Sequence, residues 1–285
     1  MGFIGLCEGD DIVTTLREVF GQNIIRVPEE RYRPLTVLAA RDGKTSFRGS
    51  FPPLVLGNPP LEFDPSLFAQ SRMSNISGKR TSSVDLDLGL NVLDGLLGGF
   101  GVPSVNIKPK FDGAKKVSYT FGDVYRLWVD INSVGRMLKG RSLDKEDPAA
   151  AIFFGNGAYS LLVLDSVITS SDFTISVDRV SKADFKLDIP AIKKIVGDLE
   201  VGVSVSSSTG LDLTFKGPQQ LAFAFSCVRF ALSETGVISQ LVPDAEAVTL
   251  YGMRATIAKE HSVQYAPDRV LLSPGAAMIE IDPLE

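Results

Sequence analysis

The clearest pattern along the chain is a stretch in which apolar and polar residues alternate without interruption. Residues 84–92 read VDLDLGLNV, so every second side chain is apolar. Because successive side chains of a β-strand point to opposite faces, this period of two predicts a strand with one apolar and one polar face. Further strands are expected at residues 159–168, 173–180 and 185–189, and the last of these also alternates.

The rest of the chain predicts a mixture of strands and a few helices. Apolar positions about three to four residues apart indicate helices at residues 12–20, 123–139 and 190–199. Helices and strands do not alternate regularly, so we expect an α+β fold: a twisted, mostly antiparallel central sheet with peripheral helices. The other expected strands lie at residues 24–27, 35–40, 105–107, 117–121, 201–205, 211–215 and 221–232, and residues 49–78 are expected to be irregular.

The scarce residue types restrict the chemistry. The 285 residues carry a formal net charge of −5 and include one histidine and two cysteines. These counts exclude a catalytic triad or metal site that needs two histidines, and they exclude a disulfide framework. The negative charge disfavours nucleic acid as a partner. We therefore expect no catalytic, metal-binding or cofactor-binding residues, and an enzyme that uses carboxylates such as Asp123 and Asp130 is the less favoured alternative.

An amphipathic strand suits two kinds of protein. It fits the half-buried sheet of a soluble protein, and it fits a membrane barrel, in which about 9–11 residues cross the bilayer. The first residues lack the basic start of a signal peptide, and no run of about 18 apolar residues predicts a spanning helix. The membrane interpretation therefore requires a soluble, cytoplasmic form that inserts later. A soluble lipid-binding carrier remains the alternative.

Two smaller features leave alternatives open. Cys7 follows an apolar run just before the first expected helix, and both a buried thiol and an acylated one are consistent with that position. Cys227 lies within an expected strand and is assigned to the core. The basic cluster of Lys108, Lys110, Lys115 and Lys116 fits either a solvated surface or contact with anionic lipid.

The chain resembles the gasdermins, particularly their compact bacterial branch. The resemblance covers most of residues 1–232 and consists of patterns rather than a catalytic signature. An opening helix and first strands at residues 16–19, 24–27 and 33–38 resemble those of the family. Segments 84–92 and 159–189 fall at the places of the family's two inserting hairpins. The strand GPQQLAFAF at residues 217–225 resembles one near the end of the family's pore-forming domain.

This resemblance implies a pore-forming domain at residues 1–250 and a short autoinhibitory segment at residues 251–285. A protease, caspase-like or similar, would remove the tail of an inactive cytoplasmic monomer. The remainder would then form a homo-oligomer in the inner membrane and kill the cell in antiphage defence. The resemblance also implies palmitate on Cys7, and its implied partners are membrane lipids, the activating protease and further copies of the chain.

The tail has features that suit such a switch. Residues 233–285 hold eight acidic and three basic residues, so they account for the whole net charge of −5. The polar stretch before Pro267 predicts an exposed loop, and apolar runs at residues 270–272 and 278–281 would hold the tail on the core. The expected cleavage loop comprises Glu260, His261, Ser262, Val263, Gln264, Tyr265 and Ala266.

The period of two also assigns the side chains that would face lipid, within hairpins expected at about residues 76–121 and 159–189. The first hairpin contributes Val84, Leu86, Leu88, Leu90 and Val92, and the second contributes Phe173, Ile175, Val177, Phe185, Leu187 and Ile189.

Overall fold

The computed structural model describes residues 23–243, except 42, 43, 58, 75, 79, 156, 157 and 182–184, together with residues 280–282. The helices are α2 (Leu86–Gly99), α3 (Ile131–Leu138) and α4 (Ile189–Gly197). The strands are β1 (Asn23–Glu29), β2 (Thr36–Arg41), β3 (Lys44–Ser50), β4 (Phe68–Arg72), β5 (Val84–Asp85), β6 (Ala114–Gly122), β7 (Tyr125–Val129), β8 (Ser160–Val180), β9 (Ser204–Ser206), β10 (Asp212–Leu232), β11 (Ile238–Pro243) and β12 (Glu280–Asp282).

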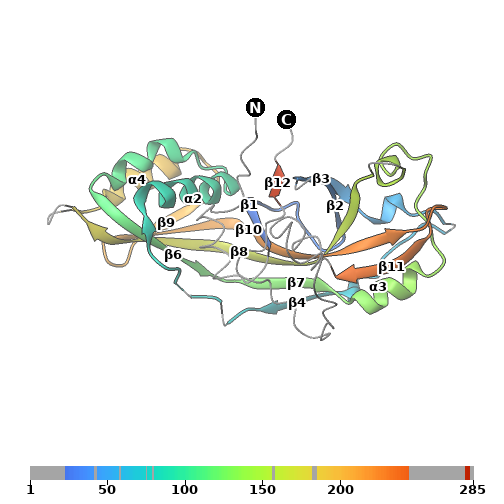
Figure 1. Cartoon of the computed structure of the whole chain (residues 1–285). Helices are drawn as coiled ribbons and strands as arrows, with labels where there is room; N and C mark the ends of the chain where they lie inside the picture. The colour runs from blue at the N-terminus through green and yellow to red at the C-terminus, as the bar shows by residue number, and fades with distance from the viewer. Residues whose placement is uncertain are drawn as a thin grey trace, which may run out of the picture.

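The described strands form one sheet of 12 strands, which runs through the whole molecule (Figure 1). Its main path is β1-β10-β8-β2-β3-β12, and the remaining strands join along β10, β8, β7 and β6. The described ladders are antiparallel apart from that of β12 with β3, which is parallel. The mostly antiparallel α+β architecture expected from the sequence is therefore confirmed.

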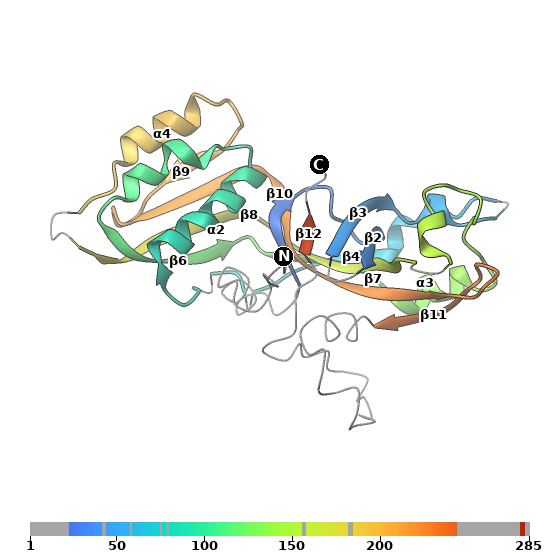
Figure 2. The same ribbon diagram turned by 45° about the horizontal axis from the view of Figure 1, so that its top comes forward.

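Two very long strands, β8 and β10, organise this sheet. Each has 21 residues, and they pair with each other from one end of the molecule to the other. At one end they lie with β6 and β9 beneath α2 and α4, and at the other end they lie with β2, β7 and β11 (Figure 2). The sequence predicts two strands in place of each long one, because polar residues interrupt the apolar runs near their middles.

The segment at residues 84–92 is the main correction to the predicted elements. Only β5 is a strand, and α2 begins at Leu86. The expected strand is wrong here because Leu86, Leu90, Leu93 and Leu97 also recur at helical spacing. Leu93 and Leu97 are completely buried. They lie beyond the alternating residues 84–92, and their burial stabilises the helix.

Two further predicted elements are wrong for the same reason. In each case an aspartate caps a helix, and the residues before that aspartate do not form the predicted element. The helix expected at residues 123–139 is instead β7 followed by α3, because the Asp130 carboxylate accepts hydrogen bonds from the amides of Asn132 (3.1 Å) and Ser133 (3.2 Å). The strand expected at residues 185–189 is a loop that leads into α4. The Asp188 carboxylate caps that helix by accepting from the Ala191 amide at 3.2 Å.

Most other expectations hold. Strands at residues 24–27, 35–40, 117–121 and 221–232 are present, as is the hairpin of β9 with β10. Residues 104–106 form a 3₁₀ turn in place of an expected strand, and β4 lies within the irregular stretch. Cys227 is buried in the core, as expected. The helix expected at residues 12–20 lies outside the described residues.

The C-terminal strand β12 lies at the edge of the sheet. Its residues Glu280, Ile281 and Asp282 are in register with Lys44, Thr45 and Ser46 of β3. Residues from the end of the chain therefore pair with a strand from near its beginning. In the described part of the chain, no helix is long and apolar enough to cross a bilayer.

Candidate functional site

Apolar side chains gather at one end of the sheet, under two helices. Here β6, residues 172–180 of β8, residues 212–216 of β10 and β9 lie side by side in antiparallel pairing, which is regular from Val117 to Gly122 of β6. We call this region the covered sheet, because α2 and α4 lie across one of its faces (Figure 2).

The face of the covered sheet beneath the helices is apolar and buried. Its side chains are at most 7% exposed, and they form one hydrophobic cluster with Leu93 and Leu97 of α2 and with Ile192 of α4. The Phe173 ring stacks on that of Phe215, with centroids 5.3 Å apart. The strand residues of this face are Val117, Tyr119, Phe121, Phe173, Ile175, Val177, Leu213 and Phe215.

The opposite face of the same strands is polar. Hydroxyl-bearing residues pair across the strands in a row, and the Thr174 and Thr214 hydroxyl oxygens are 2.7 Å apart. Each strand therefore presents an apolar side to the helices and a polar side away from them. The polar side includes Ser118, Thr120, Asp172, Thr174, Ser176, Asp212, Thr214 and Lys216.

Helix α2 rests closely on β6. A Cβ atom at Gly89 would overlap a methyl group of Val117, so only glycine allows this approach. The buried Tyr119 hydroxyl donates a hydrogen bond to the Gly89 carbonyl oxygen. Burial raises the pKa of Tyr119, so the hydroxyl keeps the proton that it donates. Close packing and a buried hydrogen bond thus hold α2 on the sheet.

Helix α4 covers the other part of the apolar face. Ile192 and Val196 point into the hydrophobic cluster, and the helix packs beside β9. Pro190 lies in the first turn, where its missing N–H costs no helical hydrogen bond. Lys110 lies 3.7 Å from Asp188, the residue that caps this helix. Both covering helices are therefore separate from the sheet ladder and attached to it by side chains.

The structure brings the predicted lipid-facing residues together. The side chain of Leu88 is outside the described set, but every other predicted residue belongs to this hydrophobic cluster or packs against it. They come from two segments far apart in the chain, namely Val84, Leu86, Leu90 and Val92 in the first and Phe173, Ile175, Val177, Phe185, Leu187 and Ile189 in the second. Cys7 and the loop at residues 260–266 lie outside the described residues.

Several residues of the apolar face are absent from the predicted set. Val117, Tyr119 and Phe121 of β6 and Leu213 and Phe215 of β10 lie between or beside the predicted ones. Both segments alternate with polar residues in the sequence, so the same period of two could have identified them.

The carboxylates considered for catalysis have structural partners. Asp123 lies 3.1 Å from a guanidinium nitrogen of Arg72 and 3.9 Å from the Lys216 ammonium group. Asp130 caps α3, and the hydrogen bond from the Ser133 side chain, followed by the Asn132 amide, lowers its pKa. Within the described ranges, no three histidine, cysteine, aspartate or glutamate side chains are grouped in a way that could hold a metal ion.

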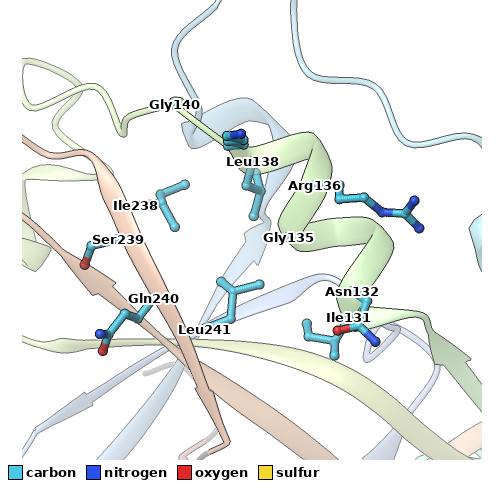
Figure 3. A pocket seen from close by; sticks show the side chains of 11 residues that line it. Ile131, Asn132, Gly135, Arg136, Leu138, Gly140, Ile238, Ser239, Gln240 and Leu241 are labelled. Atoms are coloured by element: carbon cyan, nitrogen blue, oxygen red, sulfur yellow. The ribbon is translucent and has the colours of Figure 1, made fainter.

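A groove of about 500 Å³ lies between α3 and β11, at the end of the sheet away from the covered region (Figure 3). Ile131, Leu138, Ile238 and Leu241 supply its apolar lining, whereas the Arg136 guanidinium group points away from it. The described residues that line the groove include no carboxylate, imidazole or thiol. Lys139 and Ser239 also line the groove, and no carboxylate or imidazole among the described lining residues is placed to activate either of them.

At the end of the covered sheet, Asp212 organises the turn between β9 and β10. Its carboxylate accepts hydrogen bonds from the amides of Ser208 (3.0 Å) and Thr209 (2.6 Å) and from both of their hydroxyls. Burial acts to raise the pKa of Asp212, but the hydrogen bonds from Thr209 and Ser208 outweigh burial and lower the pKa to about 2.

This lowered pKa predicts acid sensitivity. The ionised carboxylate stabilises the fold above its ordinary pKa of 3.8, and this contribution is lost as the pH falls towards about 2. We expect Asp212→Asn to lower the free energy of unfolding by about 1 kcal/mol at pH 7, after allowance for solvent screening. The difference from the parent should shrink between pH 4 and pH 2, as measured by urea denaturation. Asp198→Asn, at an exposed carboxylate, is the control, and an equal effect there would contradict the assignment.

Comparisons with known proteins agree on one family. A model described as the Bacterial Gasdermin Family matches residues 25–237. A gasdermin of Vitiosangium sp. is 31% identical over 249 residues, which cover 87% of this chain and 90% of the relative. A gasdermin of a Desulfuromonadales bacterium is 32% identical over 221 residues, covering 77% of this chain and 81% of the relative. The solved structure of a bacterial gasdermin from Bradyrhizobium tropiciagri has the same fold, with a TM-score of 0.58, 16% identity and coverage of 81% of this chain and 90% of that one.

The fold and the covered sheet define a class of protein that keeps an amphipathic antiparallel sheet beneath two helices. The family match and the curated relatives identify the class more closely. The chain belongs to the bacterial gasdermin family, and gasdermins are pore-forming proteins rather than enzymes.

Proposed function

We propose that this protein is a pore-forming effector activated by proteolysis, and that its covered sheet becomes part of the pore wall. The observation that carries the proposal is the two-sided character of that sheet. Residues of one face would contact lipid and residues of the other would line the water-filled channel. Strand β6 has nine residues, which is close to the length of about 9–11 residues that crosses a bilayer when a strand is tilted.

The covering helix α2 supports a change of conformation. Its leucines have helical spacing, which suits packing on the sheet, and residues 84–92 also alternate in the manner of an amphipathic strand. One segment therefore carries the pattern of two structures, a resting helix and an inserted strand. In the proposed pore, Val84, Leu86, Leu88, Leu90 and Val92 face lipid together with the six predicted residues of the second hairpin.

The tail is proposed to keep the protein inactive. Strand β12 pairs with the edge of β3, and strand edges are the places where further chains add to a sheet. Cleavage within residues 260–266 would leave the tail attached only by non-covalent contacts, so that it could leave. We place the boundary between the pore-forming domain and the tail at residues 250 and 251, and we assign the cleavage to a caspase-like or similar protease.

The proposed partners follow from this sequence of events. The resting form is a cytoplasmic monomer, and the cleaved form is a homo-oligomer in the lipid of the inner membrane, where it kills the cell in antiphage defence. Palmitate on Cys7 would strengthen membrane attachment. Lys108 and Lys110 lie 3.7 Å from Asp94 and Asp188, so they are paired with acids of α2 and of the α4 cap at rest. Movement of the helices would free these lysines for anionic lipid.

A pair of substitutions on α2 tests the proposed insertion. Leu86 lies in the first helical turn, where an acidic residue is favourable, and it is half-buried at the margin of the hydrophobic cluster. Urea denaturation of uncleaved Leu86→Asp measures the stability that the resting fold loses with these contacts. In the membrane the same charge would face lipid, at a cost of about 2 kcal/mol for each chain. We expect cleaved Leu86→Asp protein to release liposome dye at least about tenfold more slowly than the parent.

The matched control is Asn91→Asp, which introduces the same residue at an exposed position of the same helix. In a strand, residue 91 would face the channel, so dye release should stay within about twofold of the parent. Equal dye release by the two variants would contradict insertion of this segment. Ligand exchange without dye release would instead favour a soluble lipid carrier.

A further inference from the structure

The pairing of the long strand β8 with β6, β7 and β10 is interrupted at one level of the sheet. The pairing of β8 with β7 ends at Thr169, and its pairing with β6 begins at Asp172. On its other side, β8 pairs Asp172 with Lys216 and Ser170 with Leu221, so four residues of β10 lie opposite one residue of β8. We call this line the cross-strand break, and it comprises Asp123, residues 170–172 and residues 217–220.

The backbone at the cross-strand break departs from ordinary strand geometry. Asp123, between β6 and β7, has a φ of +41°, which is unusual for a residue other than glycine. Residues 217–220 begin with Gly217 and Pro218, and proline has no N–H to donate to a ladder. β8 changes neighbour a second time at residues 163–166, where its register with β10 shifts by one residue. At the cross-strand break, four residues of β10 lie opposite one residue of β8, so bending there would disturb fewer backbone hydrogen bonds than bending at that smaller shift.

A buried serine joins the strands at the break. The Ser170 side chain is completely buried, and its hydroxyl oxygen lies 2.6 Å from the Gly122 carbonyl oxygen and 2.7 Å from that of Asp172. The Asp172 amide donates to the same hydroxyl at 3.2 Å. Ser170 thus adds a side-chain hydrogen bond between β8 and the end of β6, beside the interrupted pairing of residue 171.

Charged groups and the end of α2 lie at the same line. Arg72 and Lys216 approach the Asp123 carboxylate, and the Asp172 carboxylate lies directly over Gly122. The Phe100 ring, at the end of α2, packs on Gly217, where a Cβ atom would overlap it. Helix α2 therefore braces the break in the resting protein.

We infer that the cross-strand break is a hinge, about which the covered sheet turns as a unit relative to the rest of the sheet, and that Ser170 is the positioning residue that holds it closed. The hinge is inferred from the pairing, the backbone at Asp123 and the Ser170 hydrogen bonds, and its use in pore opening rests on the proposed function. Loss of the Ser170 hydroxyl removes the donor that bonds the Gly122 or the Asp172 carbonyl oxygen and the acceptor of the Asp172 amide, which makes the closed position less favourable.

Distance measurements between spin labels test the hinge in the intact, uncleaved chain. One label is placed at exposed Ser206 on β9 and the other at exposed Gln240 on β11, in a chain with Cys7→Ser and Cys227→Ala. We expect Ser170→Ala to widen and shift this distance distribution. A reference pair at Ser66 and Gln240, both on the other side of the break, should keep its distribution.

Ser166→Ala is the matched control, because Ser166 is also a completely buried serine of β8 but lies away from the break, with its hydroxyl oxygen 2.7 Å from that of Ser226. It should leave both distributions unchanged. Asp123→Gly is the second test variant, since glycine accepts the positive φ and removes the ion pairs, and it should also widen the distribution. Unchanged distances between residues 206 and 240 in both Ser170→Ala and Asp123→Gly would overturn the hinge. An equal change of that distance in Ser166→Ala, or an equal change of the reference distance in Ser170→Ala, would also overturn it.

Dye release separates the hinge from the proposed function. After cleavage, Ser170→Ala should release liposome dye about tenfold faster than Ser166→Ala. Altered distances without any dye release from the parent would uphold the hinge and contradict the proposed function. Dye release from the parent with unchanged distances would uphold the function and contradict the hinge.

Discussion

Cleavage within residues 260–266 is expected to convert the protein from one that leaves liposomes intact to one that empties them. Residues 267–285 hold four acidic and one basic residue, so their release removes a charge of −3 from the pore-forming part. Near an anionic membrane, this change is worth up to about 3 kcal/mol. It also removes β12 from the edge of β3 and leaves the backbone groups of that edge available.

The experiment uses the full chain with the recognition sequence of a site-specific protease in place of residues 260–266. Vesicles of phosphatidylethanolamine and phosphatidylglycerol carry a self-quenching dye. Addition of the protease should raise the rate of dye release at least about tenfold. Uncleaved protein should stay inactive, and an excess of a peptide with the sequence of residues 267–285 should slow release by the cleaved protein. Equal release before and after cleavage would contradict an inhibitory tail.

The amphipathic strands show how far the sequence alone determines the site. The alternation at Phe173, Ile175 and Val177 identified one face of β8, and the structure places that face under α2 and α4. That prediction holds because the period of a strand is two whatever covers it. What covers a strand depends on contacts with distant segments, so neither helix could be assigned to this face from the sequence.

At residues 84–92, by contrast, the sequence pattern predicts the wrong secondary structure for the resting protein. Their alternation predicts a strand, but the resting structure contains a helix, because the stripe of Leu86, Leu90, Leu93 and Leu97 finds a complementary apolar surface on β6, β8 and β10. Secondary structure in this segment is therefore decided by tertiary contacts. The continuous strand β8 was similarly missed, since the buried polar residues Thr169, Ser170 and Ser171 resemble a turn in sequence.

A removable link between α2 and β6 is expected to abolish pore formation. A Cβ atom at Gly89 would lie 3.6 Å from the Val117 Cβ atom, which is within the range of about 3.5–4.5 Å that a disulfide requires. Gly89→Cys combined with Val117→Cys should therefore form a disulfide that fastens the helix to the sheet. Because the apolar face then stays covered, cleavage of the tail should have no effect on vesicles.

Dye release by this cleaved double variant, with and without reductant, tests most directly whether the covered sheet must be exposed to form a pore. The oxidised protein should leave vesicles intact, and reductant should restore release to the rate of the single variant Val117→Cys, which keeps Gly89 and lacks the link. A loss of 2 Da in the intact mass of the oxidised double variant, about that of two hydrogens, verifies the disulfide. Release by the oxidised, linked protein at the same rate as the reduced protein would contradict the account.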